Sequence, residues 1–242
     1  MSTPTTAGAT APALDPSFDA LAKYDRGSGR ETLKPIDAAV MAAPKDPELR
    51  ADLEVRLAAV LRGPASAVAK EYACGKLALV GGPGAVAALA ELLSNAGLAH
   101  PAADALQRLA CVEAATALRE SLSKLSGLPL VGAITALGAR RDSASVETLS
   151  GLLSSADATV ASAAAAALGE IGSGAAAKAL GAFVAKAPPA LGPALADACL
   201  VCAERLKAAG DAAGARALFE ALRAANPPAH VIDAVARVHG GA

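Results

Sequence analysis

The feature that most constrains the fold is a pair of apolar positions that recurs along the chain at nearly constant intervals. The first position is occupied by Leu89, Leu118, Leu149, Leu180 and Leu218, at spacings of 29, 31, 31 and 38 residues. The second position, four residues further on, keeps the same intervals and is occupied by Leu93, Leu122, Leu153, Val184 and Leu222. Positions four residues apart lie on one face of a helix. A helical pattern with a period near 30 residues is typical of stacked helical repeats.

Composition supports helices over strands. The 242-residue chain contains 68 alanines, and aromatic residues make up only 2%. Alanine has the highest intrinsic helix propensity, whereas strands favour β-branched and aromatic side chains. We therefore expect an all-α fold, an α-solenoid of stacked antiparallel helix pairs. Each helix is short enough to be marginal in isolation, so burial against neighbouring helices has to stabilise it.

One period of the repeat shows how a helix pair is expected to form. Asp157 is a suitable N-cap for a helix over residues 158–171, and Gly169 and Gly172 are expected to end this helix. A second helix is expected over residues 175–187, where two prolines stop it.

The same local rules apply to two neighbouring segments. Residues 163–167 are all alanine, so this helix is small on every side and is expected to lie between two layers. Asp142 is expected to cap a helix over residues 145–153, whose buried stripe contains Val146, Leu149 and Leu153.

The predicted organisation is a flexible leader over residues 1–15 and a single solenoid domain over residues 16–242. Within the domain, residues 16–62 form amino-terminal capping helices, residues 63–190 form the regular repeats, and residues 191–242 form a longer carboxyl-terminal pair and cap.

The two ends of this domain carry distinct patterns. Prolines divide the amino-terminal cap into expected helices over residues 30–43 and 47–62. Near the other end, longer helices flank Gly210-Asp211 and look like a tetratricopeptide unit. A short helix over residues 230–238 is expected to seal the last layer.

The segment Ala167-Leu-Gly-Glu-Ile-Gly172 carries a family resemblance, echoed by residues 77–82 and 136–141. It resembles a HEAT repeat of the bilin-lyase-like class, and the segments that begin at Tyr24 and Tyr72 are similar to HEAT-repeat proteins of planctomycetes and related bacteria. The resemblance implies a HEAT-like superhelix that binds protein and assigns no catalytic residue. Members often occur fused to, or alongside, sugar-dehydrogenase-like or cytochrome c modules. The Arg that many such helices carry after Val is missing after Val160, so an Asp–Arg ladder is not expected.

In such solenoids the second helices of successive repeats line a concave face that binds partners. Tyrosine and arginine are favoured at interfaces because they combine a large contact area with directed hydrogen bonds. The candidate partner-binding residues, expected on or just after those helices, are Tyr72, Lys76, Gln107, Arg108, Arg140 and Arg141. The alternative that each of them is an ordinary solubilising side chain stays open.

Cysteines and histidines offer no strong site. Cys199 and Cys202 are expected on one face of a helix as small buried hydrophobic residues, and a zinc site, which needs four ligands, is the alternative. His100, His230 and His239 lack the spacing of a triad or a metal site.

Two further motifs are expected to be structural. Residues 81–84 form a glycine-rich turn, since no Lys-Ser/Thr follows as in a phosphate-binding loop. Asp52 and Glu54 are expected to lie on a solvated face. No catalytic residue, metal or cofactor is predicted.

Charge and hydropathy limit the partners. Lys and Arg total 22 against 23 Asp and Glu, so nucleic acid, which requires a basic face, is not an expected partner. The longest uncharged stretch, Leu125 to Ala139, falls short of the roughly 18–20 apolar residues of a membrane-spanning helix, so no membrane insertion is expected. Without a recognisable signal peptide the expected compartment is the cytoplasm, or the periplasm if the chain is a fragment of a longer one.

These observations favour a non-catalytic scaffold that presents a concave helical surface to another protein, whose identity the sequence does not reveal. Two alternatives stay open from the resemblance: a tetrapyrrole (bilin) lyase or chaperone-like protein, and an accessory subunit of a sugar-oxidoreductase or cytochrome assembly. A HEAT-type DNA glycosylase is disfavoured because it would need a basic channel and stacking side chains. The oligomeric state is not predicted.

Overall fold

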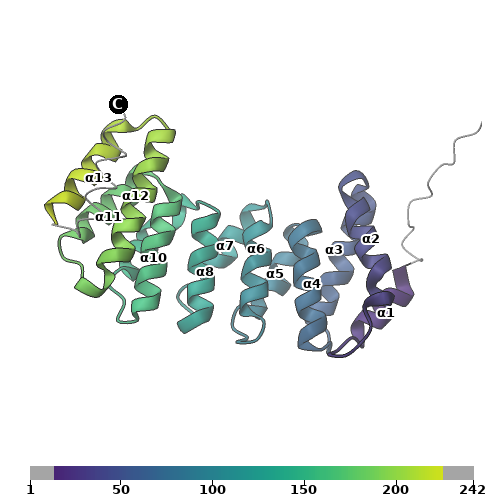
Figure 1. The fold of residues 1–242 in the computed structure, drawn as a ribbon. Helices are drawn as coiled ribbons and strands as arrows, with labels where there is room; N and C mark the ends of the chain where they lie inside the picture. The colour runs from purple at the N-terminus through teal and green to yellow at the C-terminus, as the bar shows by residue number, and fades with distance from the viewer. Residues whose placement is uncertain (1–13, 226–242) are drawn as a thin grey trace, which may run out of the picture. The chain divides into compact units, whose positions relative to one another are not determined.

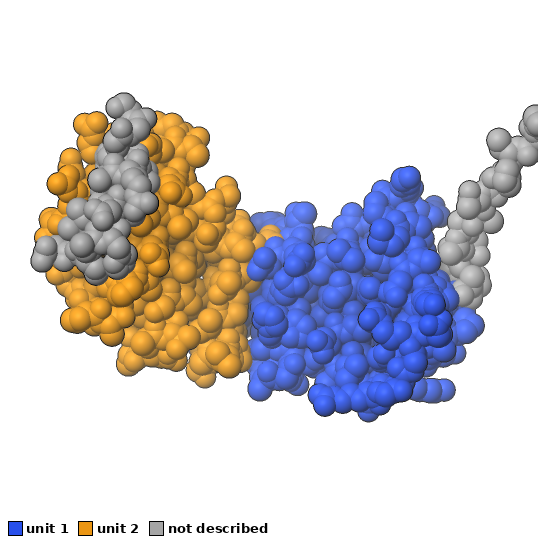
Figure 2. Space-filling model, viewed as in Figure 1, with its two compact units in different colours: residues 1–124 blue, residues 125–242 orange. Residues whose placement is uncertain are grey.

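A computed structural model describes residues 14–225, and all regular elements within that range are helical. The predicted all-α solenoid of helix pairs is therefore confirmed. The chain divides into two compact units, residues 1–124 and residues 125–242 (Figure 2). The boundary between the units falls inside the stretch predicted as regular repeats of one domain.

Unit 1 contains three helix pairs preceded by one extra helix (Figure 1). Its helices are α1 (Asp15–Ala22), α2 (Lys34–Ala42), α3 (Pro47–Arg62), α4 (Ala67–Val80), α5 (Pro83–Leu92), α6 (Ala99–Arg108) and α7 (Val112–Ser121), with the 3₁₀ turns η2 (Arg30–Leu33) and η3 (Ala43–Lys45) on either side of α2. The first helices of the pairs, α2, α4 and α6, pack in order along one layer. The second helices, α3, α5 and α7, pack in order along the other layer.

Unit 2 repeats this arrangement with three further pairs. Its helices are α8 (Gly127–Ala139), α9 (Val146–Leu152), α10 (Ala158–Ile171), α11 (Gly174–Val184), α12 (Gly192–Ala208) and α13 (Ala212–Ala224), with the 3₁₀ turns η4 (Ser143–Ser145) and η5 (Pro189–Leu191). The first helices α8, α10 and α12 lie side by side (Figure 1), and the second helices α9, α11 and α13 form the second layer.

The repeated apolar positions of the sequence form the core of both units. Both predicted columns belong to the second helices or the residue that follows them, and every member is buried. A matching buried column runs through the first helices and contains Leu77, Leu106, Leu137, Leu168 and Cys199. The larger last interval of the second-helix columns arises because α12 is longer than the preceding first helices, at 17 residues.

Helix α10 forms as its sequence predicts, except at one glycine. It spans Ala158–Ile171, and the Asp157 carboxylate accepts hydrogen bonds from the backbone N–H groups of the first turn. Gly172 ends the helix in the left-handed conformation with φ of 60°. The prediction that Gly169 also ends the helix is wrong, because this residue lies buried within α10.

The neighbouring helices differ slightly from their predicted bounds. Helix α11 ends at Val184, before the two prolines that were expected to stop it, and Ser173 caps its start. The segment after Asp142 begins as the 3₁₀ turn η4, and the Asp142 side chain makes no cap hydrogen bond there. The predicted stripe of α9, which contains Val146, Leu149 and Leu153, is buried.

Glycines allow the first helices of unit 2 to approach each other closely. A Cβ atom built on Gly138 of α8 would lie 2.7 Å from the Cα of Ala167 in α10. A Cβ on Gly169 of α10 would lie 2.7 Å from the carbonyl oxygen of Ala198 in α12. Gly138 and Gly169 occupy the same place in successive repeats, so one small-residue contact is used twice.

The alanine run of α10 is only partly enclosed. Ala164 and Ala165 are fully buried, whereas Ala166 is exposed and Ala163 is half-buried. The prediction that the helix is covered on every side is therefore wrong. Its small residues serve close packing on the inner side, and the outer side is open.

Helix α3 caps both sides of the turn between α4 and α5. The Arg50 guanidinium donates to the carbonyl oxygens of Val80 and Gly81 at 2.8 and 3.0 Å, where α4 ends. The Glu54 carboxylate accepts from the N–H of Ala85 at 2.8 Å, where α5 begins. Cations stabilise helix carboxyl ends and anions stabilise amino ends, so each charge matches its helix dipole.

This arrangement corrects one expectation and confirms another. Asp52 and Glu54 do not simply face solvent: Asp52 accepts from Arg56 on α3 itself, and Glu54 caps α5. The glycine-rich segment 81–84 is a turn that leads into α5, as predicted.

The ends of the chain are described in part. The predicted helix over residues 47–62 is confirmed as α3, and the one over 30–43 forms as η2 followed by α2. The predicted leader lies outside the described residues except for Leu14 and Asp15, and Asp15 begins α1. The predicted helix over residues 230–238 lies outside them entirely.

The longer carboxyl-terminal helices are present as α12 and α13, joined by a short turn at Ala209–Asp211. Their likeness to a tetratricopeptide unit stays a prediction.

The packing of α10 predicts opposite responses at two adjacent alanines. Ala165→Leu inserts a larger side chain into a filled contact and is expected to cost about 1–3 kcal/mol in the free energy of unfolding. Ala166→Leu adds the same atoms on the exposed side and should change stability by no more than about 0.5 kcal/mol. Urea denaturation followed by circular dichroism measures both, and equal stability of the two variants would contradict the packing described.

The glycine contact predicts a second pair of opposite effects. Gly169→Ala places a Cβ against the backbone of Ala198 and is expected to destabilise the protein by about 1–3 kcal/mol. Gly151→Ala, in α9, has no atom within 4 Å of its new Cβ and should stabilise the fold by about 0.5–1 kcal/mol. Thermal melts of the two variants are compared with the unmodified chain; a stabilising Gly169→Ala change would exclude the close contact.

Candidate functional site

The six predicted partner-binding residues lie on first helices, where the prediction placed them on second helices. Tyr72 and Lys76 belong to α4, Gln107 and Arg108 to α6, and Arg140 and Arg141 directly follow α8. The first four belong to unit 1 and the last two to unit 2. The structure brings them together only within each unit.

Tyr72 and Lys76 meet a carboxylate of the preceding pair. The Tyr72 hydroxyl donates to Asp37 on α2 at 2.8 Å, and the Lys76 ammonium lies 2.6 Å from the same oxygen. Lys76 also lies 4.9 Å from the centroid of the Tyr72 ring, and Arg30 lies 5.9 Å from it. The polar atoms of Tyr72 and Lys76 thus join α4 to α2.

The electrostatics of this cluster favour its present protonation. Burial raises the pKa of the Tyr72 phenol, and the hydrogen bond to Asp37 raises it further, so Tyr72 remains a donor. Burial alone would raise the pKa of Asp37, but the hydrogen bonds from Lys76 and Tyr72 and the positive charges of Lys76 and Arg30 lower it below 3.8. The cluster is a contact between helix pairs.

The other four candidates differ in what holds them. Arg108 is exposed and forms an ion pair with Asp104 of the same helix at 3.2 Å, a type of contact that contributes little stability. Gln107 and Arg140 are half-buried. Arg141 is exposed and has a φ of 53°, the positive value that glycine usually supplies.

A surface that the prediction missed lies on α8 and α10. Their outward positions repeat every 31 residues, so the same columns run from one helix to the next. We call this surface the uncharged face; its members are Leu128, Val131, Gly132, Thr135 and Ala139 on α8, and Thr159, Ser162, Ala163 and Ala166 on α10. Leu128 alone is 78% exposed.

The composition of the uncharged face is unusual for this protein. Helix α8 contains no charged residue, and α10 contains none before Glu170. The corresponding columns of unit 1 are charged, since α4 and α6 place Glu71, Asp104 and Arg108 at equivalent positions. Depletion of charge is the compositional mark of the central part of a protein interface.

The edges of the uncharged face are polar. Helix α12, which packs against α10, continues the columns with Pro193 and Ala194 and then places Asp197 at the exposed position equivalent to Ala166. Glu170 ends the columns of α10 and pairs with Arg205 of α12. Arg141 stands at the end of α8. A central uncharged area with charges around it matches the anatomy of a binding surface.

The sequence did contain a signal for this surface. The uncharged stretch Leu125–Ala139 was weighed only against the length of a membrane span. Its equivalent in the next repeat, residues 158–169, is also uncharged. Comparing equivalent outward positions across repeats would have identified the face.

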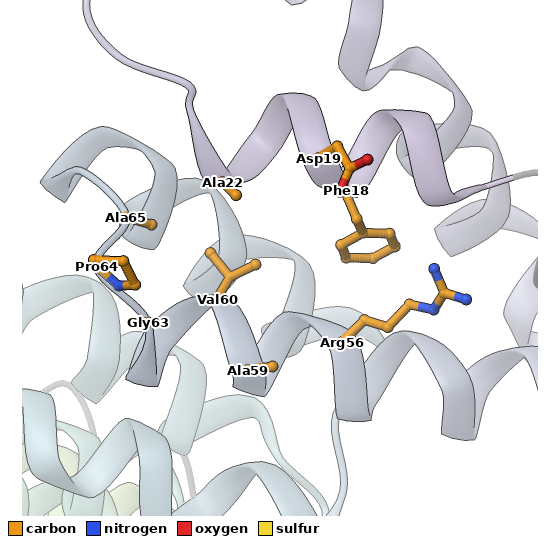
Figure 3. Close-up of a pocket in the computed structure, with 9 residues that line it drawn as sticks. All are labelled: Phe18, Asp19, Ala22, Arg56, Ala59, Val60, Gly63, Pro64 and Ala65. Carbon is orange, nitrogen blue, oxygen red and sulfur yellow. The ribbon is translucent and has the colours of Figure 1, made fainter.

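Unit 1 carries a pocket of a different kind between α1 and α3 (Figure 3). Its volume is about 340 Å³, and small or apolar side chains such as Ala22, Ala59 and Val60 line most of it. The Arg56 guanidinium lies 5.3 Å from the centroid of the Phe18 ring at one end. Arg56 is already paired with Asp15 at 2.6 Å and with Asp52 at 2.9 Å.

The cysteines behave as the sequence predicts, as buried small hydrophobic residues. Cys199 and Cys202 are both buried in α12 and neither forms a disulfide. Burial raises the pKa of the Cys199 thiol to about 12 and that of Cys202 to about 11, so both are thiols at neutral pH. The described residues contain no group of three or more His, Cys, Asp or Glu side chains placed to hold a metal ion. His100 lies exposed at the start of α6, and the other two histidines lie outside the described range.

No helix in the described part of the chain has both the length and the apolar character required to cross a bilayer.

The helix pairs of unit 2 define the chain as an α-helical repeat protein. Residues 130–198, from α8 into α12, match the family model of HEAT repeats, and the chain is accordingly a HEAT-repeat protein in this part. No curated protein shows significant sequence similarity to it. Among solved structures, human deoxyhypusine hydroxylase in complex with glycerol is similar at 16% identity and a TM-score of 0.34, over 94% of this chain and 97% of that one.

The Asp37 cluster predicts a defined pH dependence. Since the pKa of Asp37 is lower in the folded state than its ordinary value of 3.8, the carboxylate stabilises the fold above that pH, and this contribution is lost as the pH falls further. Asp37→Asn should therefore lower stability at neutral pH and flatten the loss of stability on acidification below about pH 4. Denaturation midpoints between pH 2 and pH 7 measure the effect.

The matched control is Asp19→Asn in α1, whose carboxylate has no ion-pair partner among the described side chains. If both variants showed the same pH profile as the unmodified protein, the Asp37 contacts would not contribute to stability.

Proposed function

We propose that this protein is a non-catalytic scaffold that binds another protein through the uncharged face of α8 and α10. The observation that carries the proposal is the run of equivalent outward positions without charge on two neighbouring helices, in a chain of which 19% of residues are charged. Removing such a surface from water costs little because no charged group has to be desolvated.

The build of the surface supports the same proposal. The face lies on helices whose backbones touch through Gly138 and Gly169, so its shape is set by the core. A surface fixed in this way loses little conformational entropy when a partner binds. In the first helices of unit 1, by contrast, Tyr72 and Lys76 are occupied in contacts between pairs.

The finer family resemblance, to bilin-lyase-like HEAT repeats, belongs with this proposal as an alternative function. The α1–α3 pocket is the apolar cavity that such a ligand would require, although Phe18 is the one aromatic side chain among its lining residues. Titration with an open-chain tetrapyrrole, followed by visible absorption, tests this alternative. A saturable spectral change that Phe18→Ala abolishes would favour it over the scaffold.

The scaffold proposal is tested by placing a charge on the face. Ala166→Lys should weaken partner binding at least tenfold, about 1.4 kcal/mol, because the ammonium group would be buried without a partner. The measurement is quantitative capture of binding proteins from a lysate of the source organism by the immobilised chain.

The matched control for that experiment is Ala87→Lys, which introduces the same side chain at an exposed position of α5. It should leave the captured set unchanged. A set of captured proteins that both lysine variants retain equally would exclude the uncharged face as the binding surface.

A further inference from the structure

We infer that the partner presents an α-helix that lies across α8, α10 and α12, with an acidic residue over the end of α8 and a basic residue over Asp197. This inference rests on the proposed function and specifies the chemistry of the partner. Its basis is the distribution of charge around the uncharged face.

The two ends of the uncharged face carry opposite charges. Arg141 is exposed at the α8 end, and Asp197 is exposed on α12, beyond α10. The structure gives neither side chain an ion-pair partner among the described residues. Complementary charges at the rim of an interface set the orientation of the partner and exclude wrong partners.

The conformation of Arg141 is a second observation at the α8 end. The equivalent residue of the next repeat is Gly172, which adopts the same left-handed conformation with φ of 60° at the end of α10. An arginine at this position is less favourable than glycine by roughly the energy of a left-handed residue. Residues kept in such a conformation cluster at functional sites. We therefore assign Arg141 a binding role.

The spacing of the two charges defines the partner. Neighbouring packed helices lie about 8–10 Å apart, so α8 and α12 are separated by about 16–20 Å. Asp197 corresponds to Thr135, which lies about 9 Å before Arg141 along the helix direction at 1.5 Å per residue. The two charges are thus about 20 Å apart, a distance that a partner helix spans in roughly 13 residues. The intervening residues of that helix face Thr135, Ala163 and Ala166, where small uncharged side chains fit.

The experiment uses a displayed library of alanine-based helical peptides in which one face varies among Ala, Ser, Thr, Leu, Glu and Lys. Selection on the full chain should enrich peptides with one acidic and one basic residue roughly 13 positions apart. Selection on the Arg141→Glu variant should instead enrich peptides with two basic residues. Selection on Asp197→Lys should enrich peptides with two acidic residues.

Affinities of the selected peptides give the quantitative test. A peptide selected on the unmodified chain should bind each charge-reversed variant roughly threefold to tenfold more weakly. The matched controls are Arg223→Glu and Glu220→Lys on α13, where both residues are exposed in the second layer. These control variants should bind the peptide with unchanged affinity.

The outcomes separate this inference from the proposed function. Peptides that lose binding to Ala166→Lys but show no paired charges, or do not respond to Arg141→Glu and Asp197→Lys, would overturn the inference and leave the scaffold proposal in place. A selection that yields no peptide sensitive to Ala166→Lys would overturn both.

Discussion

The contact between helix backbones in unit 2 is the constraint on which the rest of its structure depends. Where Gly138 meets Ala167 and Gly169 meets Ala198, a single added carbon would collide with main-chain or Cβ atoms. The first helices are consequently held at short separation on their inner edges, in one register that repeats every 31 residues. Dense packing of this kind transmits little deformation. The outward columns inherit that register, and the uncharged face is its external expression.

Much of the fold follows from the sequence because its periodicity reflects burial. The leucine columns predict the second helices, and Asp157 and Gly172 predict both ends of α10. Gly169 shows the limit of such reasoning. A glycine near the end of a helix suits a terminus as well as a close helix contact, and the residue that decides between them, Ala198, belongs to the next repeat. Local rules do not contain that information.

The candidate site was less accessible to sequence analysis for a related reason. Tyr72 has the chemistry of an interface anchor, but its hydroxyl meets Asp37, a residue 35 positions earlier on another pair. The uncharged face has the opposite property, because it is marked by missing charge on two helices rather than by any conspicuous side chain. It becomes visible only when Thr135 and Ala166 are known to be neighbours in equivalent columns. Residue types were therefore a weaker guide than register.

The capping of the α4–α5 turn by α3 has a consequence for how unit 1 assembles. The carbonyl groups that end α4 and the amide that begins α5 obtain their partners from Arg50 and Glu54, which precede them in the chain. Each of these helices is too short to persist alone in water. The earlier pair thus acts as a template on which the next hairpin closes, and the order of synthesis coincides with the order in which the end groups find their hydrogen bonds. Directional growth from the amino terminus is built into a single helix of this solenoid.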